Sequence, residues 1–136
     1  MPAPEGTTLD ILIVEDNPAN LLLAGAVLRR AGHRIREARS AEEARERLEA
    51  GTPDVVLMDV QLPGEDGLSL TRWIKANPAT AGVVIVALTA HAMAEDRARA
   101  LAAGCDAYLA KPIDTRTLAR EIVAIAATAR AAEVER

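Results

Sequence analysis

Short apolar segments alternate with stretches of helical periodicity along this chain, and that alternation constrains the fold more than any other feature. Apolar runs of this length, bounded by turn residues, are typical of strands. The expected strands are residues 9–15, 33–38, 54–59, 83–89 and 107–110. Strict alternation with helices is typical of parallel strands joined by right-handed crossovers. The sequence therefore predicts an α/β domain with a five-stranded parallel sheet and five helices on both faces.

Helix start and stop signals support this interpretation. Asn17 precedes Pro18, whose missing amide hydrogen suits the first helical position. Ser40 and Glu43 have the spacing of a capping box, and Asp114 is expected to cap the last helix. We expect the first helix to begin at residue 18 and the second to begin after residue 40. The third helix is expected to end at about residue 76, the fourth to begin at about residue 92, and the fifth to follow residue 114.

The length of 136 residues corresponds to one domain, which we place at residues 9–130 between tails at 1–8 and 131–136. A net charge of −4 argues against direct nucleic-acid binding through phosphate neutralisation. The aromatic residues are only Trp73 and Tyr108, so a base-stacking surface is excluded as well.

The lone cysteine, Cys105, permits no internal disulfide and fits a reducing compartment. Charged residues or glycines interrupt every apolar stretch well before the ~18 residues that a membrane span requires. The first ten residues have neither a basic start nor an apolar run suited to secretion. We therefore expect a cytoplasmic protein without membrane association.

Polar residues follow the predicted strands where each strand ends. Glu15 and Asp16 follow the first strand, and Asp59 closes the third. Thr89 closes the fourth strand, and Lys111 follows the fifth. Ligands of open parallel sheets bind beyond the carboxyl ends of the strands. The sequence therefore predicts that three carboxylates, one hydroxyl and one ammonium group converge at one edge of the sheet.

This combination of charges favours a hard divalent cation and an anionic substrate. Three clustered carboxylates repel one another unless a cation compensates them, and Mg²⁺ prefers such oxygen ligands. Together with Lys111, one Mg²⁺ neutralises the three acids, so that a phosphoryl group can approach. Asp59 can then act as the nucleophile while cations neutralise the transferring oxygens.

Other interpretations of these residues exist. Glu15 and Asp16 are also acceptable as charges near the start of the first helix, where acids are favoured. Asp59 is harder to explain without a function, because an acid that ends an apolar strand is a costly placement without a partner. Lys111 is one of only two lysines among sixteen basic residues, which suggests a need for a compact point charge.

Four segments together resemble the receiver domain of the two-component response-regulator family. They are Ile-Leu-Ile-Val-Glu-Asp-Asn at 11–17, Leu-Met-Asp-Val-Gln-Leu-Pro at 57–63, Leu-Thr-Ala at 88–90 and Tyr-Leu-Ala-Lys-Pro at 108–112. The resemblance covers about residues 9–126 and includes chemotaxis-type, cell-cycle and phosphorelay receivers as well as those of hybrid kinases. It implies the strand order 2-1-3-4-5, which is known for flavodoxin-like doubly wound domains.

The resemblance implies a role for each residue at the sheet edge. Asp59 corresponds to the phosphoacceptor, and Lys111 to the lysine that bridges the acceptor and its phosphoryl group. Asp16 corresponds to the direct Mg²⁺ ligand, Glu15 to a looser ligand, and Gln61 to the residue whose backbone carbonyl binds the metal. The Gln61 side chain is also a candidate for tuning dephosphorylation.

The resemblance also implies a switch. Thr89 and Ala90 correspond to the phosphate-binding positions after the fourth strand, and Tyr108 to the aromatic residue that turns inward when Thr89 moves. This coupling reshapes the face formed by the fourth helix, fifth strand and fifth helix, to which a downstream protein binds. Pro112 corresponds to a cis-proline, although most X–Pro bonds are trans. His91 could tune the lifetime of the phosphoryl group or could be an ordinary exposed loop residue.

The function implied is phosphorylation-controlled signalling, with a sensor histidine kinase or a histidine phosphotransfer protein as the donor. Such a chain is a stoichiometric acceptor rather than an enzyme. One alternative is an unphosphorylated scaffold or dimerisation module. Another is a small phosphatase with an aspartyl intermediate, although Gln61 stands where a dehalogenase-type phosphatase needs a second aspartate. The sequence fits both a stand-alone regulator and a hybrid-kinase receiver.

Overall fold

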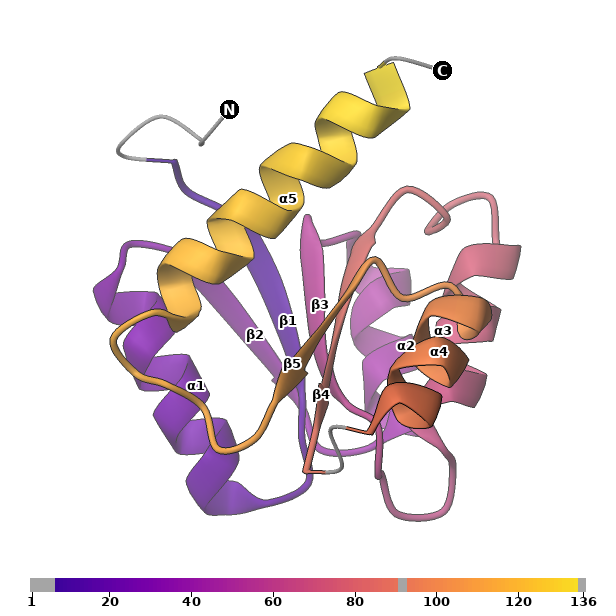
Figure 1. Ribbon diagram of the computed structural model, residues 1–136, viewed down its shortest axis with the longest axis horizontal. Coiled ribbons are helices and arrows are strands. Elements are labelled where there is room, and N and C mark those ends of the chain that lie inside the picture. The colour runs from indigo at the N-terminus through magenta and orange to yellow at the C-terminus, as the bar shows by residue number, and fades with distance from the viewer. Residues whose placement is uncertain (1–6, 91–92, 135–136) are drawn as a thin grey trace.

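The computed structural model describes residues 7–90 and 93–134, and these form a parallel sheet between two layers of helices (Figure 1). The strands are β1 (Asp10–Val14), β2 (Arg34–Ala38), β3 (Val55–Asp59), β4 (Val84–Thr89) and β5 (Ala107–Ala110). The helices are α1 (Pro18–Arg30), α2 (Ala41–Ala50), α3 (Gly67–Ala76), α4 (Ala94–Ala103) and α5 (Leu118–Val134). Neighbouring strands pair in parallel in the order β2-β1-β3-β4-β5. The predicted fold class and strand order are confirmed.

Two apolar cores lie on opposite faces of the sheet. Ile11 and Leu57 contribute to the core beneath α1 and α5, whereas their neighbours Leu12 and Met58 contribute to the core beneath α2, α3 and α4 (Figure 1). Successive strand residues point to opposite faces, so adjacent residues separate into different cores. Apart from the terminal residues Asp10, Asp59 and Thr89, the central strands are apolar because both of their faces are covered.

The helix starts follow the expected capping chemistry. The Asn17 side-chain oxygen accepts hydrogen bonds from the amides of Ala19 and Asn20, and the Ser40 hydroxyl accepts one from the Glu43 amide. These contacts satisfy amides that have no partner inside the helix.

The last two helices differ in extent from the expectation. Helix α4 begins at Ala94, and the residues 91–92 at its expected start lie outside the described part of the chain. Asp114 starts a turn before α5, because its side chain accepts from the Arg116 amide and its carbonyl accepts from the Leu118 amide. Helix α5 therefore begins one turn after Asp114, and it extends to Val134, into the segment expected as a tail.

Cys105 is a buried free thiol beside the Thr71 hydroxyl, with 3.7 Å between Sγ and Oγ1. Burial raises the pKa of this thiol, which is the behaviour of a small core residue. In the described residues, no helix has both the length and the apolar character needed to cross a bilayer.

His33 gives the fold a titratable buried contact. Its Nδ1 atom accepts a hydrogen bond from the Leu9 amide at 3.0 Å, and the side chain is buried just before β2. An imidazole that accepts at Nδ1 must be neutral there. Burial lowers the pKa of His33 below its ordinary value of 6.5.

We predict that His33 makes the folded state less stable as pH falls below 6.5. The unfolded chain binds a proton there while the folded chain resists it, so protonation favours unfolding. His33→Asn keeps an acceptor near the Leu9 amide but does not titrate. Urea unfolding of both proteins between pH 8 and about pH 5 should show the wild type losing stability relative to His33→Asn. Parallel pH profiles would contradict this prediction.

Candidate functional site

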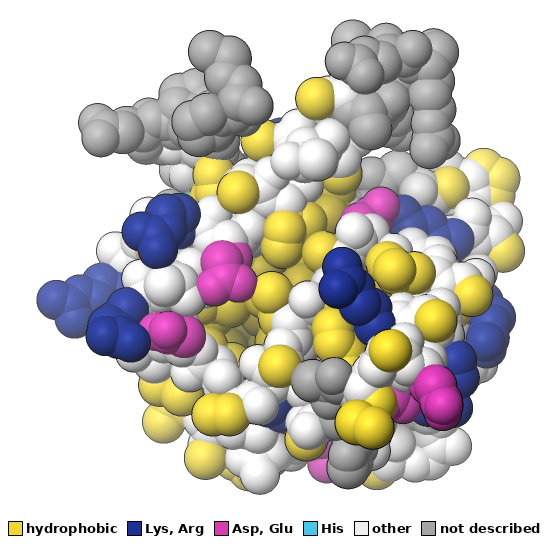
Figure 2. All heavy atoms as spheres, viewed as in Figure 1, with side chains coloured by type: hydrophobic (Ala, Val, Ile, Leu, Met, Phe, Trp, Pro, Cys, Tyr) yellow, Lys and Arg dark blue, Asp and Glu magenta, His cyan; other side chains and the backbone are white. Residues whose placement is uncertain are grey.

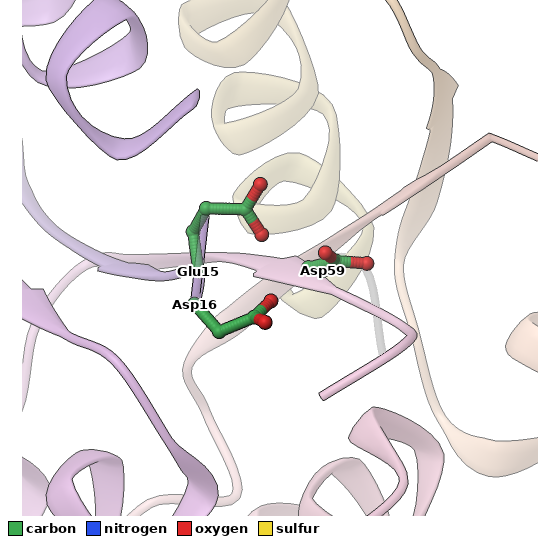
Figure 3. Close-up of side chains that lie close together, drawn as sticks. All are labelled: Glu15, Asp16 and Asp59. Carbon is green, nitrogen blue, oxygen red and sulfur yellow. The ribbon is translucent and has the colours of Figure 1, made fainter. Parts of the chain in front are cut away.

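Three carboxylates meet at the carboxyl edge of the sheet. Glu15 and Asp16 follow β1, and Asp59 ends β3, the strand hydrogen-bonded to β1. Since Val14 is in register with Met58, the acids that follow these two residues come out side by side. One oxygen of each carboxylate lies within 4.8 Å of the others, and the three side chains point into a common space (Figure 3). The predicted convergence of these acids is confirmed.

Lys111 joins two of these acids. Its Nζ atom lies 2.9 Å from Asp59 Oδ2 and 3.0 Å from Glu15 Oε1, and its side chain is only 18% exposed. The Lys111 amide donates to the Thr89 carbonyl at 2.8 Å, which extends the β4–β5 pairing and fixes the origin of the side chain. The bond between Lys111 and Pro112 is cis, as the resemblance implied.

Glu15 and Asp59 are both buried, but their surroundings shift their pKa values in opposite directions. Burial and the neighbouring Asp59 raise the pKa of Glu15 to about 7, against the lowering effect of Lys111. Burial opposes ionisation of Asp59 too, but contacts with Glu15, Lys111 and the Gln61 amide lower its pKa below the ordinary value. The two carboxylates raise the pKa of Lys111 against the effect of its own burial. The lowered pKa of Asp59 and the raised pKa of Glu15 favour Asp59 as the ionised acid of the pair.

One oxygen of Glu15 has no hydrogen-bond partner among the described residues, although it is buried. A void of about 10 Å³ is lined in part by Glu15, Asn20 and Asp59, and the Asn20 side chain acts on Glu15 to lower its pKa. Unpartnered buried carboxylate oxygens are costly and normally mark a missing ion or water. Asn20 belongs to the surroundings of the site but was not identified from the sequence. The sequence feature that could have indicated Asn20 is its position as a polar residue on the first turn of α1, one turn after Asp16.

These residues fit a magnesium ion. The donors are all oxygens, and three carboxylates with one ammonium leave a formal charge of −2, which one divalent cation balances. Asp16 is the most exposed of the three acids and gives access from solvent. Gln61 stands two residues beyond Asp59, where its amide donates to Asp59 Oδ1 at 2.9 Å, so its backbone is adjacent to the site.

Thr89 and Tyr108 line a groove of about 510 Å³ beside the acids. Thr89 is buried at the end of β4, and Tyr108 is half-buried on β5. Gln61, whose amide donates to Asp59, lines the same groove, and α4 contributes Asp96 and Arg99 to it. Ala90 is exposed at the end of the described segment, and His91 lies outside the described residues.

The fold and the site define an open parallel α/β domain with a lysine-bridged cluster of acids at its carboxyl edge. The chain matches the response regulator receiver domain over residues 11–123 and belongs to that family. It is 38% identical over 106 residues to the polar-differentiation response regulator DivK of Brucella ovis, which covers 78% of this chain and 86% of DivK. It is also 41% identical over 109 residues to a gliding motility regulatory protein of Myxococcus xanthus. That match covers 80% of this chain but only 14% of the Myxococcus protein.

Solved structures agree with this assignment. A response regulator from Chloroflexus aurantiacus superimposes with a TM-score of 0.84 at 34% identity, covering 89% of this chain and 99% of that one. The receiver domain of a sensor histidine kinase from Pseudomonas aeruginosa, whose active-site cleft holds a coordinated magnesium ion, gives a TM-score of 0.77. Its identity is 40%, over 85% of this chain and 95% of that one. The chain is therefore a phosphoacceptor receiver of two-component signalling, and the predicted family and function are confirmed.

Gly67, the first residue of α3, is a second residue beside the site that was not identified from the sequence. A Cβ atom there would lie 2.7 Å from the Asp59 carbonyl oxygen and 3.0 Å from the Val60 Cα. Both neighbours are backbone atoms, so the end of β3 would have to move. Glycine allows α3 to approach the end of β3 this closely.

We predict that Gly67→Ala destabilises the fold by about 1–3 kcal/mol and slows modification of the site, because it displaces the backbone that carries Asp59. Gly25→Ala in α1 is the matched control. Its Cβ would meet the ends of the Arg29 and Glu37 side chains, which can move, and alanine favours the helix. Urea unfolding and the rate of labelling by acetyl phosphate should separate the two variants. Equal behaviour would show that the close approach at Gly67 is unimportant.

Proposed function

We propose that Asp59 is the residue that accepts the phosphoryl group, donated by the phosphohistidine of a sensor histidine kinase or a histidine phosphotransfer protein. The observation that supports this most strongly is the Lys111 ammonium group, which contacts both Asp59 and Glu15. It favours the ionised form of Asp59 at the edge of the sheet and compensates one of the three negative charges there.

In the proposed step, a carboxylate oxygen of Asp59 attacks the phosphorus atom. A P–O bond forms as the P–N bond to the donor imidazole breaks, and the leaving nitrogen keeps the electron pair and takes a proton. Lys111 is already within hydrogen-bond distance of Asp59 Oδ2, so its charge is in place as negative charge spreads over the phosphoryl oxygens. Hydrolysis of the acyl phosphate by water returns Asp59 and inorganic phosphate.

We propose that Glu15, Asp16, Asp59 and the backbone carbonyl of Gln61 hold Mg²⁺. The unpartnered oxygen of Glu15 and the spacing of the three carboxylates support this assignment. When bound, the ion supplies positive charge that neutralises the acids and the phosphoryl oxygens. The Pseudomonas receiver with its coordinated magnesium is the related precedent.

We further propose that Thr89 and Ala90 bind phosphoryl oxygens beside Lys111 and that Tyr108 follows the movement of Thr89. The support is the groove that Thr89 and Tyr108 share with Gln61. Gln61 has an exposed side chain next to Asp59 and is proposed to tune dephosphorylation, as is His91.

The proposed output surface is the face formed by α4, β5 and α5. Strand β5 is an edge strand, and its Ala107 and Leu109 are only partly buried. Apolar side chains gather between α5 and α4 on this side of the molecule (Figure 2), and Ala119 and Val123 of α5 are partly buried there. A partly covered apolar face suits a protein partner rather than nucleic acid or a membrane.

The chain is proposed to act in the cytoplasm as a stoichiometric acceptor rather than an enzyme, with its receiver domain over residues 9–130. Its single cysteine is buried and unpaired, which agrees with a reducing compartment. The comparisons do not support the scaffold or phosphatase alternatives.

We predict that acetyl phosphate labels the wild type with one phosphoryl group only when Mg²⁺ is present, and that Asp59→Asn abolishes labelling because it removes the nucleophile. Intact-mass spectrometry measures the product. Asp114→Asn is the matched control, because it makes the same substitution outside the site at an exposed residue.

Persistent labelling of Asp59→Asn would show that another residue is the acceptor. Multiple turnover of an added phosphoester by the wild type would favour the phosphatase alternative. A binding partner that recognises wild type and Asp59→Asn equally, with and without acetyl phosphate, would favour the scaffold.

A further inference from the structure

The loop between β3 and α3, residues 60–66, contacts the acceptor directly. Its Gln61 amide donates to Asp59 Oδ1 at 2.9 Å, so any displacement of this loop changes the surroundings of the carboxylate. The loop closes at its far end through the Gly67 amide, which donates to the Val60 carbonyl at 2.9 Å. Between these two points, Leu62 packs into the core beneath α2, α3 and α4, whereas Pro63 and Gly64 are exposed, so the outer part of the loop has no core contact at those two residues.

Glu65 fastens the outer part of this loop to α2. Its two carboxylate oxygens accept from Nη1 and Nη2 of Arg45, with 2.7 Å between Nη1 and Oε1. Two parallel hydrogen bonds fix both the distance and the orientation of the carboxylate, unlike a single-contact ion pair. The hydrogen bonds from Arg45 lower the pKa of Glu65, so the pair stays ionised at neutral pH.

Trp73 of α3 fixes Arg45 in turn. The guanidinium carbon lies 5.2 Å from the centre of the indole ring, within the range of a cation–π contact. The Arg45 side chain is 28% exposed, and Trp73 packs against the core beneath α2, α3 and α4. The arginine is therefore held in place before it meets the loop, and the cost of ordering its long side chain is reduced.

We propose that Arg45 is a positioning residue for the acceptor site: through Glu65 and Trp73 it holds the β3–α3 loop so that the Gln61 backbone stays against Asp59. We call the set of Arg45, Glu65 and Trp73 the loop clasp. The inference rests on the proposed function, because it assigns the clasp to the chemistry of Asp59. It also makes the α2–α3 surface, remote from the acids, a place from which the site can be influenced.

The first test measures the loop itself. Arg45→Met keeps an unbranched apolar chain beside Trp73 but removes both hydrogen bonds, and Glu65→Gln removes the charge from the loop side. Amide hydrogen exchange by NMR should show faster exchange of the Gln61 amide in both variants, by about fivefold, with unchanged exchange in the central strands. Arg29→Met is the matched control, because Arg29 also makes an ion pair, with Glu37, but on α1.

The second test measures the site. Calorimetric Mg²⁺ affinity and the rate of labelling by acetyl phosphate should each fall about fivefold in Arg45→Met and in Glu65→Gln, with wild-type values in Arg29→Met. The double variant should be no worse than either single variant, because both remove the same connection. Arg45→Lys should restore only part of the affinity, because a lysine cannot make the two parallel hydrogen bonds.

The outcomes separate this inference from the proposed function. Wild-type exchange at Gln61 and wild-type Mg²⁺ affinity in Arg45→Met, with labelling still at Asp59, would overturn the clasp and leave the proposed function intact. A loss of global stability in urea without a specific change at Gln61 would show a merely structural ion pair. If the wild type is not labelled at Asp59, the proposed function fails, and Gln61 exchange still decides whether the clasp holds the loop.

Discussion

The contact of one ammonium group with two buried carboxylates is the interaction on which the site depends. Glu15 and Asp59 approach each other because the parallel strands β1 and β3 end at the same edge of the sheet. Without Lys111, repulsion between the two carboxylates would destabilise the folded state. The lysine does not neutralise the cluster completely. The remaining negative charge and the unpartnered oxygen of Glu15 make this edge of the sheet suited to a divalent cation. A cation at this edge would therefore gain favourable interactions, because the charge of the acids is not fully compensated within the folded protein.

The same physical logic explains the second lysine. The Lys75 ammonium donates to the Val83 carbonyl at 2.7 Å and lies 3.2 Å from Asp106 Oδ2, in a partly buried position between α3 and the start of β4. Both lysines of this arginine-rich chain thus serve as compact charges that reach several oxygens from different segments. A planar guanidinium group prefers two parallel bonds to one carboxylate, as Arg45 makes with Glu65.

The sequence predicted the sheet, its neighbouring helices and the cluster of acids because these depend on local patterns and on one topological rule. An apolar run marks a covered strand, and parallel strands bring their carboxyl ends together, so Glu15, Asp59 and Lys111 could be identified before any distance was known. Asn20, Gly67 and the loop clasp were missed. Their importance arises from contacts between elements: the void beside Glu15, the approach of α3 to the Asp59 carbonyl, and the ion pair from α2 to the β3–α3 loop. Such contacts have no fixed spacing along the chain, so a pattern in a single sequence does not indicate them.

The alternation of side chains along the strands places Thr89 and Tyr108 on the face of the sheet that α2, α3 and α4 cover. Ile85 and Ala87 of β4 face the core beneath α2, α3 and α4, and by the same period of two Thr89 points to that side. Tyr108 pairs with Ala87 across β4 and β5 and packs against the same core, so the two proposed switch residues share one face. On that face, α4 buries only Ala100 and Ala103, whose small side chains contribute little apolar area to its attachment. The proposed movement of Thr89 is therefore directed to the face where α4 buries only small side chains, whereas α1 and α5 are held by leucine and isoleucine side chains on the opposite face.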